Sequence, residues 1–302
     1  MAWTLGIIGG SGLYDVDGLD DPQWVDVESP LGKVSDAILC AELHGVRLRF
    51  LPRHGRGHRL LPGEVDYRAN IDALKRAGCT DLVSLSAVGS LRESFAPGDF
   101  VAVNQFIDRT RGRASTFFGE GVVAHVSLAD PVCSRLLERL ADAAEAAGAT
   151  VHRADMLTYL AMEGPQFSTR AESELYRSWG CDVIGMTNMP EAKLAREAEL
   201  PYATLGMVTD YDCWHDGHGA VEVADVLAVL SRNAATAART VAKLARTLAA
   251  TPRTPSPQGI ETCLDTALLT PPEAQPPETK ARLSAVLERV NAARALSGFD
   301  SP

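Results

Sequence analysis

The stretch Gly6-Ile7-Ile8-Gly9-Gly10-Ser11-Gly12-Leu13 lies near the start of the chain and sets the prediction of its fold class. The apolar residues 5–8 are typical of a buried strand, and the glycines after them indicate a tight loop at its carboxyl end. Further strand-like runs follow, at residues 37–43, 46–51, 81–87, 100–103, 182–186 and 202–209. Several are apolar throughout, as in a sheet that is covered on both faces.

Helical patterns alternate with these runs, at residues 66–77, 132–147, 170–179, 191–200 and 221–249. Alternating strands and helices indicate an α/β protein. We therefore predict a single domain with a mixed central β-sheet flanked by helices. Because Val88-Gly89-Ser90 follows the strand at 81–87, we expect a loop there, at the edge of the sheet where α/β proteins place ligands.

The composition changes after residue 250, where seven prolines interrupt the chain up to Pro277. We expect no regular structure in this segment, which we interpret as a linker or a surface wrap. Beyond it, apolar residues at helical spacing predict one amphipathic helix: Leu283, Val286, Leu287 and Val290. We divide the chain into a domain at 1–250 and a segment at 251–302 that packs on the same domain or on a neighbouring subunit.

Composition and charge exclude several classes of protein. The 302 residues are 46% hydrophobic, which excludes wholesale disorder, and 29 Lys and Arg against 39 Asp and Glu give a net charge of −10. This charge argues against a nucleic-acid partner. The six cysteines are far apart and read as reduced thiols, and we find neither a signal peptide nor a long apolar span. We expect a cytoplasmic protein without membrane contact.

The Gly-rich loop is a candidate anion site, because successive backbone N–H groups can converge there and Ser11 adds a hydroxyl. A plain turn at the end of a strand is the alternative. The loop departs from the dinucleotide-binding fingerprint, since Asp15 stands where a third Gly or Ala is needed.

A second candidate anion site is the loop Arg53-His54-Gly55-Arg56-Gly57-His58. The guanidinium fork of arginine matches phosphate oxygens, and histidine can add a donor. A solvated basic turn is the alternative, and a zinc site is disfavoured by the neighbouring arginines.

Paired carboxylates follow the last strand-like run, in Thr209-Asp210-Tyr211-Asp212. A two-residue period puts both on one side if the chain stays extended. Like charge and burial raise carboxyl pKa values, and a shift of about 3 units would keep one of them protonated at pH 7. Metal binding or a solvated loop remain open.

In Glu163-Gly164-Pro165-Gln166-Phe167, the aromatic ring suits stacking on a planar ligand. Taken on its own, this motif is better explained by a Phe in the core.

Taken together, seven motifs resemble in order the 5′-methylthioadenosine phosphorylases, within the trimeric purine nucleoside phosphorylases. They are residues 6–13, Pro52–His58, Ser86–Arg92, Asp108–Thr110, Glu163–Ser168, Gly185–Thr187 and Thr209–Trp214. The resemblance covers roughly residues 5–250 and implies a nucleoside phosphorylase-like fold. It also implies phosphorolysis of a 5′-substituted adenosine, in purine and methionine salvage, by a pentosyltransferase.

The resemblance further implies the residues of the site, with no metal or organic cofactor and inorganic phosphate as co-substrate. The phosphate would be bound by Ser11, Arg53, His54, Ser86, Ala87 and Thr187. The nucleoside would be bound by Phe167, Ser168, Met186, Tyr211, Val223, Val226, Leu227 and His125, with Asp210 and Asp212 as catalytic residues at the base. Asp210 would serve purine N7, because breaking an N-glycosidic bond requires a proton or hydrogen bond there.

Substrate choice follows from the same resemblance. Relatives that act on 6-oxopurines carry Asn at the position of Asp210, so this chain resembles the adenine-specific members. Val223 stands where purine nucleoside phosphorylases place a His for the 5′-hydroxyl, and an apolar pocket favours a methylthio group or another small 5′-substituent, such as a halogen. His125 matches a segment that reaches a neighbouring subunit's sugar site, which implies a homotrimer.

Three other functions remain open at this stage. The Gly-rich loop is compatible with a nucleotide-binding or dehydrogenase-like module. A purine nucleoside phosphorylase acting on adenosine or inosine would differ only in its substrate pockets. A metal-dependent hydrolase would use His54, His58 and the aspartate pair, and a chelator would inactivate it.

Overall fold

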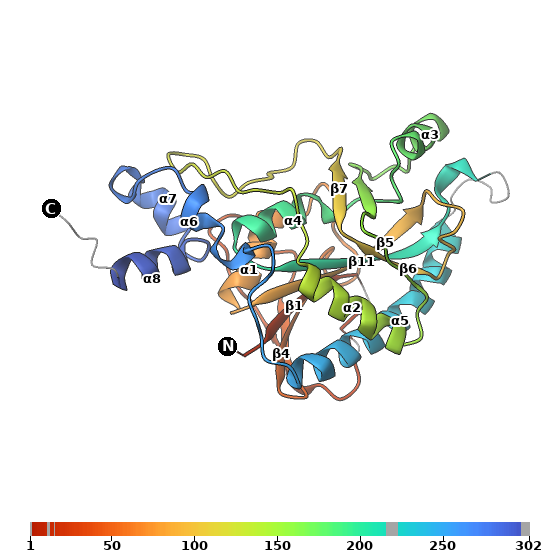
Figure 1. The fold of residues 1–302 in the computed structure, drawn as a ribbon, viewed down its shortest axis with the longest axis horizontal. Helices are drawn as coiled ribbons and strands as arrows, with labels where there is room; N and C mark the ends of the chain where they lie inside the picture. Colours follow the sequence, from red (N-terminus) through yellow and green to blue (C-terminus); the bar gives the residue numbers. More distant parts are fainter. Residues whose placement is uncertain (1, 11–12, 15, 216–222, 297–302) are drawn as a thin grey trace.

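The computed structural model describes residues 2–10, 13–14, 16–215 and 223–296, and for residues 223–228 it describes the backbone alone. The strands are β1 (Thr4–Gly9), β2 (Asp20–Val25), β3 (Ile38–Leu43), β4 (Val46–Pro52), β5 (Asp81–Ser90), β6 (Phe100–Val103), β7 (Gln105–Asp108), β8 (Val151–His152), β9 (Thr158–Ala161), β10 (Val183–Gly185) and β11 (Tyr202–Asp210). The principal helices are α1 (Tyr67–Arg76), α2 (Ser134–Ala146), α3 (Arg170–Ser178), α4 (Asn188–Glu197) and α5 (Val223–Ala249). All of them belong to one mixed α/β architecture (Figure 1).

The strands form one mixed sheet with β5 at its centre. Along its main path the order is β2-β3-β4-β1-β5-β10-β9-β7, and β11 pairs with β5 and continues to β6 and β8. Strands β1, β4, β5 and β11 are parallel to their neighbours in this central part, whereas β10 runs antiparallel to β5 and β6 antiparallel to β11. The predicted mixed central sheet is confirmed.

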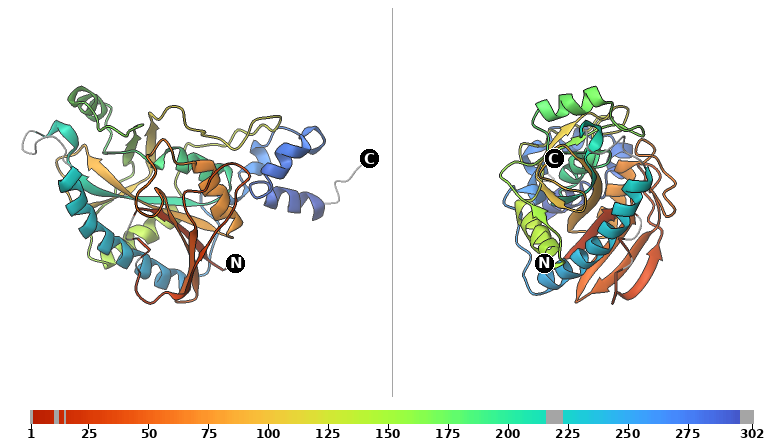
Figure 2. Two further views of the ribbon diagram at one scale, coloured as in Figure 1. Left: turned by 180° about the vertical axis from the view of Figure 1, so that it is seen from behind. Right: turned by 90° about the vertical axis from the view of Figure 1, so that its right-hand side faces the viewer.

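Helices cover both faces of the sheet, which explains the apolar central strands. On one face α2 and α5 pack on each other and on β11, around a core that includes Leu136, Leu140 and Leu244. On the other face α1 and α4 pack together over a second core that includes Ile71 and Leu194. Figure 2 shows the helices and the sheet from behind and from the side. A strand buried on both sides has no polar face, so β1 is buried along its whole length.

On one side of β5 the neighbouring strand changes from β1 to β10, and a gap in the pairing lies between them. The first half of β5 pairs with β1 as far as Ile8 opposite Ser84, and its last residues pair with β10 from Ile184 opposite Gly89. On its other side β5 pairs with β11 throughout. Neither β1 nor β10 therefore pairs with residues 85–88 of β5 on the first side. Such switch points are where open α/β sheets bind ligands.

The sequence missed four strands and ended one too early. β2 is an edge strand whose six residues are all exposed, so no apolar pattern marks it, and β7, β8 and β9 are four residues or shorter. The expected loop at Val88-Gly89-Ser90 is wrong, because β5 runs on to Ser90 through its pairing with β10. Helix α4 begins at Asn188 and ends at Glu197, three residues earlier at each end than expected.

The Pro-rich segment contains short helices, contrary to our expectation. These are a 3-10 turn at Ile260–Thr262, α6 (Leu264–Ala267), a 3-10 turn at Pro272–Ala274 and α7 (Pro277–Arg282). The single amphipathic helix that we predicted is also wrong: residues 283–287 form a turn, and α8 (Glu288–Leu296) follows. The four apolar residues are nevertheless all buried, because the turn folds them into the core of α1 and α4.

Buried arginines attach this segment to the sheet. Arg253 Nε donates to Asp81 Oδ2 at 2.5 Å, and Arg135 Nη2 of α2 donates to Asp81 Oδ1 at the same distance. The helices α6 to α8 lie at one end of the molecule, opposite α3 (Figure 1). Residues on both sides of position 250 contribute to one hydrophobic core. Our division of the chain at residue 250 stays a prediction.

Candidate active site

Two hydroxyl groups meet at residues 85–88 of β5, which pair with neither β1 nor β10. Ser86 Oγ of β5 lies 3.0 Å from Thr187 Oγ1, which comes from the turn between β10 and α4. Both residues are buried. The predicted phosphate residues Ser86, Ala87 and Thr187 are thus brought to one place, where hydroxyls can donate to an anion.

A tyrosine that sequence reasoning missed stands behind this pair. Thr187 donates its backbone N–H to the hydroxyl of Tyr159 at 3.3 Å. Tyr159 is fully buried, and a Cβ atom on Gly185 would come within 2.1 Å of its hydroxyl oxygen. Glycine at position 185 therefore lets the tyrosine reach Thr187. Tyr159 lies on a strand that the sequence did not reveal.

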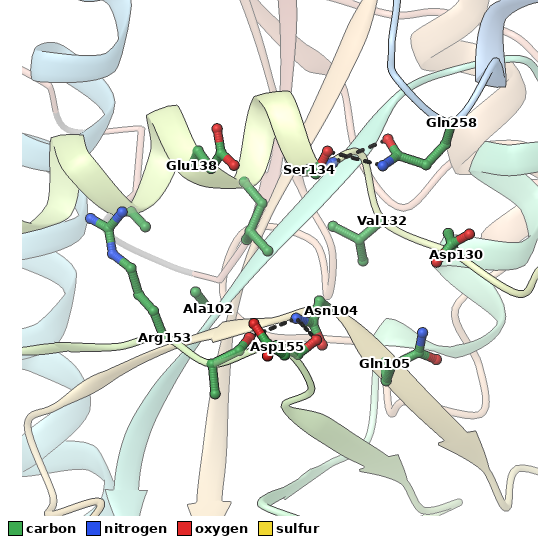
Figure 3. A pocket seen from close by; sticks show the side chains of 13 residues that line it. Ala102, Asn104, Gln105, Asp130, Val132, Ser134, Glu138, Arg153, Asp155 and Gln258 are labelled. Atoms are coloured by element: carbon green, nitrogen blue, oxygen red, sulfur yellow. Dashed lines mark hydrogen bonds between the residues drawn. The ribbon is translucent and has the colours of Figure 1, made fainter.

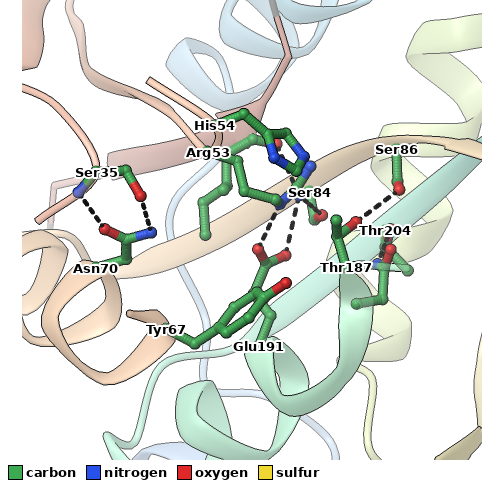
Figure 4. A network of polar contacts seen from close by, with 12 residues as sticks. Ser35, Arg53, His54, Tyr67, Asn70, Ser84, Ser86, Thr187, Glu191 and Thr204 are labelled. Carbon is green, nitrogen blue, oxygen red and sulfur yellow. Dashed lines mark hydrogen bonds and ion pairs between the residues drawn. The ribbon is translucent and has the colours of Figure 1, made fainter. Parts of the chain in front are cut away.

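Arg53 lies beside the hydroxyls with most of its donors engaged. Nε donates to Glu191 Oε2 at 2.8 Å, and Nη2 donates to Glu191 Oε1 at 3.1 Å and to Ser84 Oγ at 2.6 Å (Figure 4). Among the residues that the structure describes, Nη1 donates only to the carbonyl of Leu85, at 3.4 Å. Nη1 is therefore the part of the guanidinium best placed to serve a phosphate. Glu191, which we did not predict, compensates the charge of Arg53 in the buried site.

His54 is a neutral imidazole with a defined tautomer. Its Nδ1 lies 2.9 Å from the carbonyl oxygen of Leu60, and because a carbonyl only accepts, Nδ1 carries the hydrogen. Burial and the positive charge of Arg53 lower the pKa of His54 to about 4. The ring of His58 stacks on it at 4.5 Å. Nε2 is left as an acceptor, so the imidazole would receive a hydrogen bond from a protonated phosphate oxygen.

The two aspartates lie close together above Gly89. Asp210 Oδ1 accepts the backbone N–H of Asp212 at 2.8 Å, and Asp210 Oδ2 accepts the hydroxyl of Thr209 at 2.7 Å. A Cβ on Gly89 would lie 3.0 Å from Asp210 Oδ1 and 3.4 Å from the Asp212 Cβ. The extended conformation that we assumed ends at Asp210, and Asp212 begins a 3-10 turn with φ +53°. This turn, and not a strand period, brings the carboxylates together.

Burial gives both carboxyls an elevated pKa. Desolvation raises the pKa of Asp210, and burial with the negative charge of Asp210 raises that of Asp212. Asp212 Oδ2 is buried and makes no well-formed hydrogen bond among the described groups, although the nearby hydroxyl of Ser173 partly offsets the rise of the Asp212 pKa. A buried acceptor without a partner costs free energy until a ligand donates to it. The pair is therefore suited to a ligand that offers N–H groups and accepts a proton.

The other residues that we predict to contact the purine base lie around the aspartate pair. Phe167 is 45% exposed, and Ser168 accepts the thiol of Cys213 at its carbonyl, at 3.3 Å. Tyr211 stacks on His215 at 4.7 Å and meets Trp214 edge-on, so its ring belongs to an aromatic cluster beside the pair. The predicted stacking role of Phe167 stays a prediction.

Met186 lies against the loop that starts at Glu163. A Cβ on Gly164 would come within 2.5 Å of Met186 Sδ, which shows how closely the two loops approach. His125 lies elsewhere, on an irregular segment whose backbone N–H donates to Ala267 of the C-terminal segment at 2.9 Å. Ser11 lies outside the described residues, as do the side chains of Val223, Val226 and Leu227.

A cavity of about 360 Å³ lies away from these residues, between α2, β6 and residues 153–155 (Figure 3). Its polar side chains are bonded to the protein itself: Asn104 donates to the carbonyls of Ala154 and Asp155, and Gln258 donates to Ser134. None of our predicted site residues lines it. The chemistry points to the switch point of the sheet rather than to this cavity.

Within the described ranges of the chain, no three His, Cys, Asp or Glu side chains gather in a group that could hold a metal ion. Among the same residues, no helix combines the length and apolar character needed to cross a membrane.

Comparison with known proteins agrees with the geometry. Residues 4–246 match the phosphorylase superfamily. An S-methyl-5′-thioadenosine phosphorylase from Cereibacter sphaeroides is 59% identical, over 96% of this chain and 99% of that protein. A methylthioadenosine phosphorylase from an antarctic soil metagenomic library has a TM-score of 0.88 at 50% identity, covering 95% of this chain and 99% of the other. A methylthioadenosine phosphorylase from Schistosoma mansoni in complex with adenine has a TM-score of 0.78 at 35% identity, covering 88% and 99%. The chain therefore belongs to the phosphorylase superfamily and, within it, to the family of the S-methyl-5′-thioadenosine phosphorylases.

Proposed function

We propose that this protein cleaves 5′-methylthioadenosine with inorganic phosphate, giving adenine and 5-methylthioribose 1-phosphate. One observation carries the proposal: Ser86 of the hydroxyl pair and Gly89, over which the aspartate pair lies, belong to the same strand, β5. Ser86 and Gly89 are three residues apart on β5, about 10 Å at the usual rise of a strand. A sugar ring fits between an anion at Ser86 and a base at Asp210. The names of the similar proteins support the same reaction.

The aspartate pair would stabilise the departing base. Cleavage of the N-glycosidic bond moves electrons into the purine ring, so a proton or hydrogen bond at N7 lowers the barrier. Asp210 has a raised pKa and can hold that proton at a higher pH than an exposed aspartate. Asp212 Oδ2, which makes no well-formed hydrogen bond within the described part of the chain, would accept from the 6-amino group. An oxo group at that position offers no hydrogen, which explains a preference for adenine.

The opposite end of the site would hold the phosphate. Ser86, Thr187 and the Nη1 edge of Arg53 supply donors, and His54 Nε2 supplies an acceptor for a P–OH group. A phosphate held beneath C1′ stabilises the positive charge that develops on the sugar and is positioned to attack it. We propose that phosphate enters as co-substrate and that the reaction uses neither a metal nor an organic cofactor.

We further propose that the protein works as a cytoplasmic homotrimer. The segment with His125 and the C-terminal segment run side by side, joined by Leu269 N–H to the Val123 carbonyl at 2.9 Å. Val123 is 43% exposed and Leu269 is 61% exposed. Exposed apolar residues of this kind favour burial against a second copy. The six cysteines are all free thiols, which agrees with a reducing compartment.

The test is the release of free base from 5′-methylthioadenosine, adenosine and inosine, each with and without phosphate. Phosphate-dependent release chiefly from 5′-methylthioadenosine is the expected result. Release without phosphate would indicate a hydrolase. Chief activity on adenosine or inosine would indicate a purine nucleoside phosphorylase, and release from a 5′-halogenated adenosine alone would indicate a different 5′-substituent.

A further inference from the structure

Arg113 is a buried arginine outside the motifs that define the site. It lies in the irregular segment between β7 and α2, yet its side chain is only 3% exposed. A buried cation is costly unless its hydrogen-bonding groups are satisfied. The hydrogen-bond partners of Arg113 therefore indicate which parts of the structure its side chain holds together.

The guanidinium of Arg113 bonds to two loops of the proposed site. Nη1 donates to the carbonyl of Met186 at 2.6 Å and to that of Met189 at 3.0 Å. Nη2 donates to the carbonyl of Glu163 at 2.6 Å, and Nε donates to its carboxylate at 3.2 Å. One side chain thus joins the turn after β10 to the loop after β9.

A fourth partner residue of Arg113 lies on α1. Nη1 of Arg113 is 3.1 Å from the hydroxyl of Tyr67, which itself donates to the carbonyl of Pro62 at 3.1 Å. The guanidinium carbon lies 5.4 Å from the centre of the Tyr67 ring. Tyr67 is buried, so it gives Arg113 a rigid support.

The two loops carry the residues that would hold the sugar and the phosphate. The first contains Met186 and Thr187, and the second leads to Phe167 and Ser168. They approach so closely that a Cβ on Gly164 would lie 2.5 Å from Met186 Sδ. A shift between the loops would therefore move the sugar and base contacts relative to the phosphate contacts.

We propose that Arg113 is a positioning residue of the sugar site, which fixes the Met186–Thr187 turn against the Glu163 loop through its guanidinium fork. The inference rests on the proposed function, because that function places the substrate against the two loops that Arg113 joins. Lysine cannot replace the arginine, since an ammonium lacks the planar set of five donors that reach carbonyls on both loops.

The experiment compares wild type, R113A and R113K in phosphate-dependent cleavage of 5′-methylthioadenosine, with and without added guanidinium chloride below its unfolding range. We expect kcat/KM of R113A to fall about 10²-fold, as for other changes that misplace a site by about 1 Å. Guanidinium should restore part of the activity, and methylammonium should not. R113K should stay folded and remain impaired.

R111A is the matched control, because Arg111 is exposed and contributes only its backbone N–H to Glu163, at 2.5 Å. It should retain the activity of the wild type. An R113A protein with wild-type kcat/KM, or one that guanidinium does not rescue, would overturn the inference. If R113A does not fold, wild-type activity in R113K would overturn it. An inactive wild type would refute the proposed function instead, so the two failures are distinguishable.

Discussion

Arg53 Nε donates to Glu191 Oε2 at 2.8 Å, and each of these side chains is 2% exposed. Tyr202 donates to the other carboxylate oxygen at 2.8 Å, so the glutamate is held from two sides. The cation that the sequence marked as a phosphate ligand is thus also half of a buried ion pair. Arg53 can serve the site only in the orientation that Glu191 imposes.

Glu191→Gln should destabilise the protein by about 3 kcal/mol, because removing one partner of a buried pair leaves an uncompensated charge. Urea denaturation at neutral pH measures this loss. The double variant Arg53→Met with Glu191→Met is the control and should lose less free energy of unfolding than the single change. A double variant that loses as much as the single variant, or more, would contradict the cost assigned to the unpaired Arg53 charge.

Asp210→Asn should lower kcat for adenine release by about 10²- to 10³-fold, the range of a lost general acid. The variant should also gain relative activity on 6-oxopurine nucleosides, because an amide at N7 can also donate to the adjacent 6-oxo group, which a carboxylate at this position repels. Parallel assays of adenine and hypoxanthine release measure both effects. Unchanged rates on 5′-methylthioadenosine would remove Asp210 from the mechanism.

The rate should depend on pH through the acid form of Asp210. Burial raises its pKa, so the protonated form persists to higher pH than in an exposed aspartate, and activity falls as the pH rises through the raised value. A profile of kcat/KM against pH should show this decline in the wild type. The same decline in Asp210→Asn would assign it to another group.

The buried, neutral His54 should make the free energy of unfolding decrease as the pH is lowered from about 6.5 to about 4. Its pKa is about 4 in the folded protein and about 6.5 when unfolded, so between these values the unfolded chain binds more protons and stability decreases as the pH is lowered. Relative to wild type, His54→Gln should gain about 2 kcal/mol on going from pH 7.5 to pH 5. Urea titrations at both pH values measure the difference. A constant difference between the two proteins would contradict the buried neutral imidazole.

Val223→His should shift preference from 5′-methylthioadenosine toward adenosine, because an imidazole can bond a 5′-hydroxyl. The ratio of kcat/KM for the two substrates measures the shift. This prediction comes from the sequence alone, since the Val223 side chain lies outside the described residues. An unchanged ratio would remove Val223 from the 5′ pocket.

The sequence by itself determined the central architecture and supplied the candidate residues of the site. Apolar runs and helical periods in the sequence reflect which side chains are buried. The sequence therefore predicted several elements close to their true bounds, namely β1, β4, β6, β11 and the first three helices. Ser86, Thr187, Asp210 and Asp212 could be named because their motifs resemble a known family in order.

The tertiary structure alone decided how these groups are held. Edge strand β2 is exposed throughout, and β7 and β8 are only partly buried, so no continuous buried face marks them and their pairing reveals them. Glu191, Tyr159 and Arg113 act through partners far away in the chain, such as Arg53, 138 residues from Glu191. Local sequence records which side chains are apolar or charged. Which buried charge meets which partner depends on the packing of distant segments, and that packing exists only in the folded protein.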